Sequence, residues 1–199
     1  MSDDDLFRMI LLGYCLVFMP FGLYHRLRAN TGEKLDRWQE GVLILFGLRL
    51  TSLTLAVGGI GWLINPAWLA WAAMPIPAWI RWIGLAMAGL GGMLLVWTFR
   101  NLDKNLTDTV VTRKQHTLVT TGPYRWIRHP FYASYLLGFV GCSVAAANWL
   151  FLLLGTIGFG FMLARIRIEE QKLIERFGDA YRRYMARTGR FVPRIVRTG

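Results

Sequence analysis

Five apolar segments dominate the chain, and charged residues are nearly absent from them. They cover roughly residues 6–24, 42–64, 79–99, 131–147 and 149–164. As helices the first three would each reach about 28 Å or more, which is enough to cross the hydrocarbon core of a bilayer. No segment alternates apolar and polar positions, so the pattern favours α-helices and argues against a membrane β-barrel.

The last two apolar segments are short and nearly continuous. Only Asn148 and its immediate neighbours separate them, which predicts a tight helical hairpin. The whole pattern predicts an all-α, polytopic membrane protein with about five transmembrane helices.

A different pattern follows the fifth segment. Between residues 166 and 187 the apolar side chains fall on one helical stripe, with Arg and Lys on the other faces; the stripe contains Ile166, Leu173, Ile174, Phe177, Tyr181 and Tyr184. This predicts a C-terminal amphipathic helix that lies against the bilayer or packs on a neighbouring loop. We therefore expect one membrane domain over residues 1–199, with three spans in 1–99 and a loop, the hairpin and the amphipathic helix in 100–199.

The charged residues suggest an orientation. Basic residues concentrate in linkers 25–40 and 100–130 and in the tail, whereas 65–78 carries no charge. The positive-inside rule then places the linkers and the C-terminus in the cytoplasm and the N-terminus outside. Five tryptophans should gather at the outer headgroup layer: Trp62, Trp68, Trp71, Trp79 and Trp82.

Composition and net charge indicate which classes of binding partner to expect. Of the 199 residues 54% are hydrophobic, which excludes a disordered chain, and the net charge is +11. Because the basic residues flank apolar segments, we expect anionic lipid headgroups as partners rather than nucleic acid. The two cysteines lie inside apolar segments and no histidine cluster has metal-ligand spacing, so neither a disulfide framework nor a metal site is expected.

One candidate site lies before the fourth segment. Gly122-Pro123 predicts a turn, and Pro130 suits the first position of a helix. His129 would then lie near the helix N-cap, where free N–H groups and the helix dipole favour an anion such as a carboxylate. The alternative is that Arg128 and His129 are ordinary interfacial anchors.

A second candidate site follows the fifth segment. Arg165 and Glu169 are four residues apart and share a helix face. Glu170 falls within the apolar stripe, where a carboxylate is costly unless a cation meets it. The alternative is a surface lattice of ion pairs.

Both sites lie within a pattern that identifies a family. Residues 116–132 read HTLVTTGPYRWIRHPFY and residues 165–193 read RIRIEEQKLIERFGDAYRRYMARTGRFVP. These runs resemble the isoprenylcysteine carboxyl methyltransferase family, integral-membrane enzymes that use S-adenosyl-L-methionine and are related to the phospholipid methyltransferases. The resemblance covers residues 101–193, and the first two spans are similar only in hydropathy.

The resemblance implies residue roles. Two groups of residues would hold the cofactor: His116, Thr117, Leu118, Val119 and Tyr124 in the loop, and His129, Pro130, Phe131 and Tyr132 at the start of the following helix. A carboxylate after the last span would hold it from the opposite side. Counting back from Leu173-Ile174 places this carboxylate at Glu169, whereas its position in the apolar stripe favours Glu170. The family's arginine for the methyl-accepting carboxylate falls on Arg165.

The expected reaction is methyl transfer to a lipophilic acceptor at the cytoplasmic membrane face. The resemblance implies carboxyl O-methylation of an isoprenylcysteine-like substrate, a reaction in which an ionised carboxylate would need no general base. The alternatives are methylation of a phospholipid or another small lipophilic amine or thiol, and a non-catalytic membrane scaffold.

Overall fold

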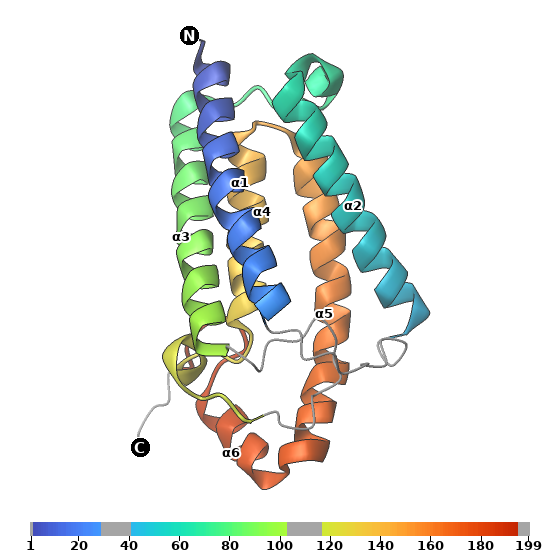
Figure 1. The fold of residues 1–199 in the computed structure, drawn as a ribbon, viewed down its shortest axis with the longest axis vertical. Coiled ribbons are helices and arrows are strands. Elements are labelled where there is room, and N and C mark those ends of the chain that lie inside the picture. Colours follow the sequence, from blue (N-terminus) through green and yellow to red (C-terminus); the bar gives the residue numbers. More distant parts are fainter. Residues whose placement is uncertain (1, 29–40, 103–116, 195–199) are drawn as a thin grey trace.

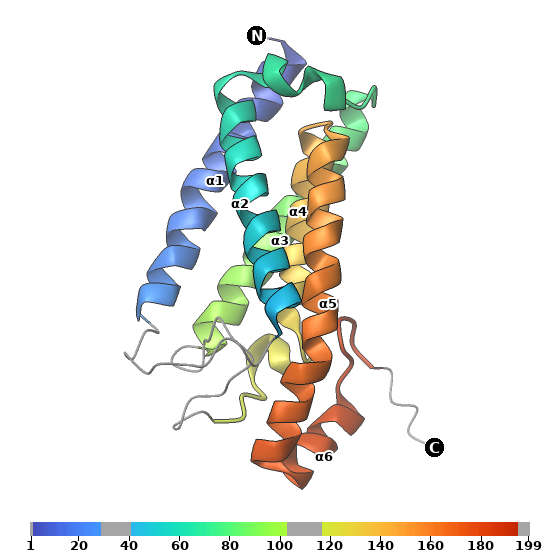
Figure 2. The ribbon, with the colours of Figure 1, turned by 90° about the vertical axis from the view of Figure 1, so that its right-hand side faces the viewer.

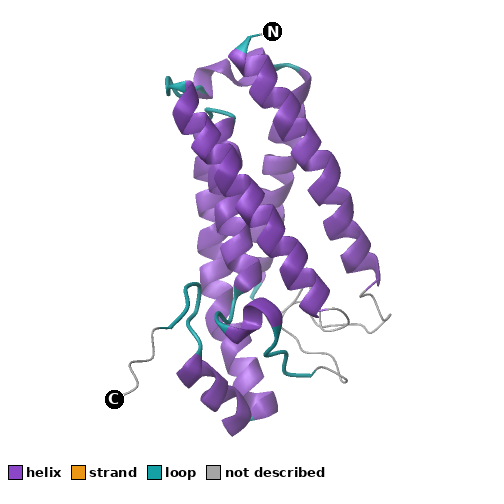
Figure 3. Ribbon diagram, turned by 90° about the vertical axis from the view of Figure 1, so that its left-hand side faces the viewer, coloured by secondary structure: helices purple, strands orange, loops and turns teal. Residues whose placement is uncertain are grey.

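A computed structural model describes residues 2–28, 41–102 and 117–194 of the chain. The elements in chain order are α1 (Asp3–Arg28), α2 (Val42–Ile64), the 3-10 helix η2 (Pro66–Ala72), α3 (Ala78–Leu102), the 3-10 helix η4 (Gly122–Arg125), α4 (Pro130–Ala145), α5 (Trp149–Phe177) and α6 (Asp179–Arg187). The five long helices form an elongated bundle, and α6 lies beyond the end opposite the N-terminus (Figure 1). In these ranges only isolated β-bridges occur and there is no strand (Figure 3).

The predicted polytopic helical fold is confirmed. Helices α1, α2, α3 and α5 are long and apolar enough to cross a membrane, whereas α4 has only 16 residues. Most large apolar side chains on α1 and α2 are exposed at the surface of the bundle, including Leu16, Leu43 and Leu53. A protein in water would bury them, so this surface suits contact with lipid chains.

Helices α3 and α4 approach each other closely because glycines line their contact. A Cβ atom built on Gly84 would lie 2.7 Å from the backbone nitrogen of Ala145, and one on Gly91 would lie 2.8 Å from that of Gly138. Small residues let helix backbones pack tightly inside membranes. This packing holds the short α4 against the long α3.

The predicted hairpin between the last two apolar segments is present. Ala147 adopts a positive φ of 49°, and the side chain of Asn148 accepts hydrogen bonds from the backbone N–H groups of Leu150 and Phe151. The same side chain donates to the carbonyl of Leu69 in η2. Asn148 therefore caps the N-terminus of α5 and also connects the hairpin turn to η2.

Helix α5 differs from the prediction. We expected a span over 149–164 followed by a separate amphipathic helix, but α5 is continuous for 29 residues to Phe177. Its length is about 43 Å, which exceeds the hydrocarbon core, so the last part projects beyond the membrane. The first break comes at Gly178, which has a φ of 53°, and only then does α6 begin.

At the N-terminal end of the bundle, the buried side chain of Arg81 on α3 contacts both α1 and α4. Arg81 donates from its Nε atom to the carbonyl of Ala145, lies 2.5 Å from the carboxylate of Asp4 and stacks over the ring of Phe7. The exposed tryptophans Trp68, Trp71, Trp79 and Trp82 are also at this end, but Trp62 is not among them. It is buried against Phe151.

Helices α1 and α2 diverge away from the N-terminal end in both side views (Figures 1 and 2). An apolar cavity of about 420 Å³ lies between α1, α2 and α4. Tyr14, Phe18, Phe131 and Tyr135 are among its lining residues, and so are both cysteines, Cys15 and Cys142.

Candidate functional site

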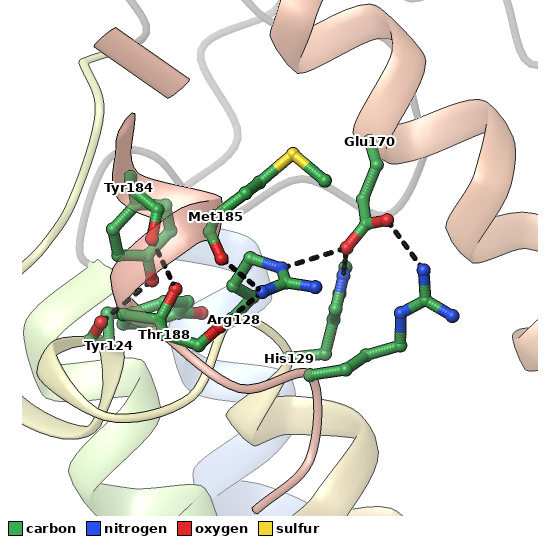
Figure 4. Close-up of polar contacts among 8 residues, drawn as sticks. Tyr124, Arg128, His129, Glu170, Tyr184, Met185 and Thr188 are labelled. Atoms are coloured by element: carbon green, nitrogen blue, oxygen red, sulfur yellow. Dashed lines mark hydrogen bonds and ion pairs between the residues drawn. The ribbon is translucent and has the colours of Figure 1, made fainter. Parts of the chain in front are cut away.

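The two candidate sites meet at one place, where α4 begins and α5 leaves the membrane. His129 is the N-cap of α4 and Pro130 is its first residue, as the sequence predicted. The imidazole of His129 is not a side-chain cap for the helix. It points instead toward Glu170 on α5 (Figure 4).

Glu170 is buried and contacts three side chains. One carboxylate oxygen accepts from Arg128 Nε at 3.0 Å and lies 3.1 Å from His129 Nε2. The other oxygen accepts from Arg190 at 2.9 Å. The carboxylate in the apolar stripe thus has the cationic partners that its burial requires.

Glu170 lies past the apolar part of α5, outside the membrane-spanning stretch 149–164. Burial raises the pKa of Glu170, but the hydrogen bonds from His129, Arg128 and Arg190 outweigh burial and lower it from 4.5 to about 2. The side chain is therefore ionised at neutral pH and fixed in place by its donors.

Backbone hydrogen bonds bring a distant segment to the same place. The N–H groups of Arg128 and His129 donate to the carbonyls of Gly189 and Arg190 at 2.9 and 3.1 Å. The guanidinium of Arg128 also donates to the carbonyls of Met185 and Thr188 (Figure 4). We call residues 188–194 the C-terminal segment, and these bonds hold it against the start of α4.

Glu169 has a different neighbour from Glu170. Its carboxylate accepts a hydrogen bond of 2.6 Å from the hydroxyl of Tyr132 on α4. The Tyr132 ring stacks on the ring of His129, with centroids 5.2 Å apart. The two adjacent glutamates thus contact α4 through different side chains, and Glu170 is the one surrounded by cations.

Tyr124 lies in η4 and is connected to α6. Its carbonyl accepts a hydrogen bond of 2.7 Å from the hydroxyl of Tyr184. Burial raises the pKa of Tyr184 to about 12, so the hydroxyl stays protonated as a donor. The turn before it needs Gly122, which has a φ of 59°, and any Cβ there would strike Asn101.

The remaining predicted residues are distributed around this centre. Phe131 stacks on Phe99 of α3, and Arg165 lies on α5 one turn before Glu169. Thr117, Leu118 and Val119 lie in the loop before η4, and His116 is outside the described residues. The structure therefore brings together His129, Pro130, Phe131, Tyr132, Glu169 and Glu170.

Sequence reasoning missed Arg190 and the C-terminal segment. The cost of burying Glu170 indicated that a cation was needed, but it did not say which of the many arginines supplies it. Arg128, for which an anchoring role was the alternative, is in fact a partner of Glu170.

Both candidate regions lie largely within a stretch of the chain that matches a known family. Residues 79–180 match the family model described as phospholipid methyltransferase. Curated relatives include a protein-S-isoprenylcysteine O-methyltransferase of Xenopus laevis, 34% identical over 120 residues, covering 59% of this chain and 42% of the relative. Another is protein-S-isoprenylcysteine O-methyltransferase B of Arabidopsis thaliana, 32% identical over 118 residues, covering 58% and 60%.

A solved structure is also similar. It is that of the eukaryotic intramembrane Ras methyltransferase, isoprenylcysteine carboxyl methyltransferase, with a TM-score of 0.53 and 26% identity, covering 77% of this chain and 53% of that one. The chain spans about half the length of the relatives that it matches.

Proposed function

The chain belongs to the phospholipid methyltransferase family, and from that premise we propose that it transfers a methyl group from S-adenosyl-L-methionine to a lipophilic acceptor. Carboxyl O-methylation of an isoprenylcysteine-like substrate is the reaction that fits best, since curated relatives are named protein-S-isoprenylcysteine O-methyltransferase. One observation carries the proposal: the start of α4 and the acidic pair of α5, some 40 residues apart, meet through Tyr132–Glu169 and His129–Glu170.

The residues at this place fit the cofactor. S-adenosyl-L-methionine carries a positive sulfonium whose methyl group is already activated for transfer. Three donors offset the charge of Glu170, so the carboxylate of Glu169 is the one suited to meet a cation or a ribose hydroxyl. The stacked rings of His129 and Tyr132 offer aromatic faces beside it.

The proposed cofactor residues therefore keep the assignments made from the sequence. Residues 117–119 and Tyr124 would hold the cofactor from the loop side, and His129–Tyr132 from α4. His116, which lies outside the described residues, keeps the cofactor role that the resemblance implies. Glu169 contacts it from α5, while Glu170 acts through the residues that it positions.

Arg165 is the residue we assign to the acceptor. It lies on the face of α5 that carries Glu169, one turn nearer to the membrane. A guanidinium there can hold a carboxylate through two parallel hydrogen bonds. An ionised carboxylate held there would accept the methyl group as the carbon–sulfur bond of S-adenosyl-L-methionine breaks, leaving neutral S-adenosyl-L-homocysteine and no proton to remove.

The lipid chain of the acceptor has a place in the apolar cavity between α1, α2 and α4. The cavity is lined by Phe131, which precedes Tyr132 on α4, and by Tyr135, three residues after Tyr132. A chain in this cavity would enter from the bilayer, while the polar cofactor enters from water. The protein then mainly positions the two reactants and excludes water.

We further propose that the reactive end of the bundle faces the cytoplasm and the N-terminus lies outside. The basic residues near the reactive end support this orientation. Residues 1–199 are proposed to act as one methyltransferase domain, with 1–99 supplying three spans and 100–199 the site.

The test is transfer of a labelled methyl group from S-adenosyl-L-methionine to a lipidated-cysteine analogue in detergent. We expect Arg165→Ala and Glu169→Gln to reduce kcat/KM at least 100-fold. Arg167→Ala, an exposed neighbour on another face of α5, is the matched control and should retain turnover. Full activity in both site variants would contradict the assignment.

The family description also favours a second candidate, N-methylation of a phospholipid amine. A neutral amine must lose a proton, so that reaction would need a base and would rise steeply with pH. Methyl esters are hydrolysed by base whereas N-methyl groups survive it, and this separates the two products. Failure of S-adenosyl-L-methionine to bind the purified protein would instead favour a non-catalytic scaffold.

A further inference from the structure

A second cavity, of about 580 Å³, lies beside the C-terminal segment and α6. Four arginines line it: Arg128 from the turn before α4, Arg182 from α6, and Arg190 and Arg194 from the C-terminal segment. Ile174 and Met185 supply apolar wall. Residues far apart in the sequence therefore bring four arginines to one open depression, whose surface also has apolar parts.

The carboxylates near this cavity balance only part of its charge. Glu170 pairs with Arg128 and with one nitrogen of Arg190. Asp179 pairs with Arg182 at 3.0 Å, but both side chains are mostly exposed, so the pair is weak and exchangeable. Arg194 donates to the carbonyl of Ala186, which carries no formal charge. Two carboxylates therefore pair with three of the four arginines, and the cavity favours an anion.

This cavity is separate from the place proposed for methyl transfer. Successive residues of a helix are about 100° apart, so Ile174 lies about 40° to one side of Glu170 and Glu169 lies about 100° to the other. Glu169, Tyr132 and Arg165 are not among the lining residues. The buried Glu170 lies between the two faces.

The C-terminal segment also touches the membrane-spanning part of the bundle. The ring of Phe191 lies 6.1 Å from that of Phe159, which belongs to the apolar stretch of α5. The next residue, Val192, is 72% exposed although it is apolar. An exposed apolar residue at this depth, flanked by Arg190 and Arg194, is suited to the boundary between headgroups and acyl chains.

We propose that this arginine cavity binds the phosphate of an anionic phospholipid headgroup, with Val192 in the adjoining lipid. Guanidinium groups match phosphate oxygens through paired hydrogen bonds, and arginines at a membrane surface attract anionic lipid. The bound lipid would connect α6 to the C-terminal segment. This site is distinct from the acceptor site and does not depend on methyl transfer.

The experiment is a titration of the purified full chain in detergent with phosphatidylglycerol, followed by native mass spectrometry. The test variant is Arg182→Gln/Arg194→Gln. The control is Arg183→Gln/Arg187→Gln, which removes the same charge from exposed α6 arginines that do not line the cavity. A thermal unfolding curve for each variant establishes that it is folded.

We expect at least tenfold tighter binding of phosphatidylglycerol than of phosphatidylcholine to the wild type and the control. The test variant should lose this preference. Equal loss in both double variants would overturn the proposal, because surface charge alone would then explain binding. Displacement of phosphatidylglycerol by an equal concentration of inorganic phosphate would also overturn it, since the site would then take a free anion rather than a lipid.

Discussion

The hydroxyl of Tyr132 donates a hydrogen bond of 2.6 Å to the carboxylate of Glu169, although 37 residues separate them in the chain. This bond joins α4 to α5 at the proposed cofactor position. The contact of His129 with Glu170 also joins the start of α4 to α5 but is buried. The two contacts predict different consequences when each is removed.

Loss of the Tyr132 hydroxyl should affect turnover more than stability. A hydrogen bond to a charged group is worth about 1.5–3 kcal/mol, which corresponds to about 10- to 100-fold in rate if it holds Glu169 in position. We expect Tyr132→Phe to lower kcat/KM in that range. Wild-type kcat/KM in Tyr132→Phe, measured by methyl transfer, would show that the hydroxyl is not needed.

Loss of the Glu170 carboxylate should affect stability first. Glu170→Gln leaves Arg128, His129 and Arg190 without their buried acid, at a cost of about 3 kcal/mol at neutral pH. Glu175→Gln, on the exposed face of the same helix, should change stability by less than about 0.5 kcal/mol. Thermal unfolding in detergent compares them, and equal melting temperatures for the two variants would contradict this role.

The same substitution predicts a pH dependence. Because the pKa of Glu170 is lowered from 4.5 to about 2 in the folded chain, its ionised form stabilises the fold fully above about pH 4.5. That stabilisation is lost as the pH falls from 4.5 toward 2. The difference in melting temperature between wild type and Glu170→Gln should therefore shrink over this interval, and a difference that stays constant from pH 7 to pH 3 would contradict it.

Arg190 should control how firmly the C-terminal segment is held. Arg190→Gln removes its ion pair with Glu170, which is half-exposed on the arginine side and worth about 1 kcal/mol. The amides of Arg128, His129 and Gly189, which bond across this contact, should then exchange hydrogen roughly fivefold faster. Arg187→Gln is the charge-matched control, and hydrogen exchange that rises equally in both variants would count against the assignment.

The glycines of α3 offer a matched test of helix packing. Gly84→Ala places a Cβ 2.7 Å from the Ala145 backbone nitrogen and should destabilise the protein by about 1–3 kcal/mol. Gly89 has nothing within 4 Å of the corresponding position, so Gly89→Ala should leave the melting temperature unchanged or slightly raised. Comparable losses in both would indicate that α3 and α4 do not pack as described.

Much of this architecture could be predicted because membrane helices carry a strong local signal. The bounds expected for the second span, 42–64, agree with α2, and Asn148 marked the hairpin turn. The end of α5 could not be found from hydropathy, because the helix continues past its last apolar residue through charged residues that favour helix equally well. The residue in the sequence that marks the end of α5 is Gly178.

At the candidate site, the sequence indicated which residues could act on a ligand but not which of them contact one another. Sequence alone leaves the cofactor carboxylate open, because the spacing to the family's motif favours Glu169 and the apolar stripe favours Glu170. In the structure Glu169 bonds to Tyr132 and Glu170 is the buried residue of the stripe. The role of Arg190 depends on the C-terminal segment returning to the start of α4, a long-range contact that no local pattern encodes.

The unbroken course of α5 fixes the height of its acidic pair above the bilayer. With no hinge between the apolar stretch and the glutamates, Glu169 lies about 8 Å along the helix axis beyond Ala164. A reactant anchored in the lipid must therefore extend its reacting group to that level. Under the proposed function, the fixed length of α5 would select acceptors by the distance between their hydrocarbon anchor and their reactive atom.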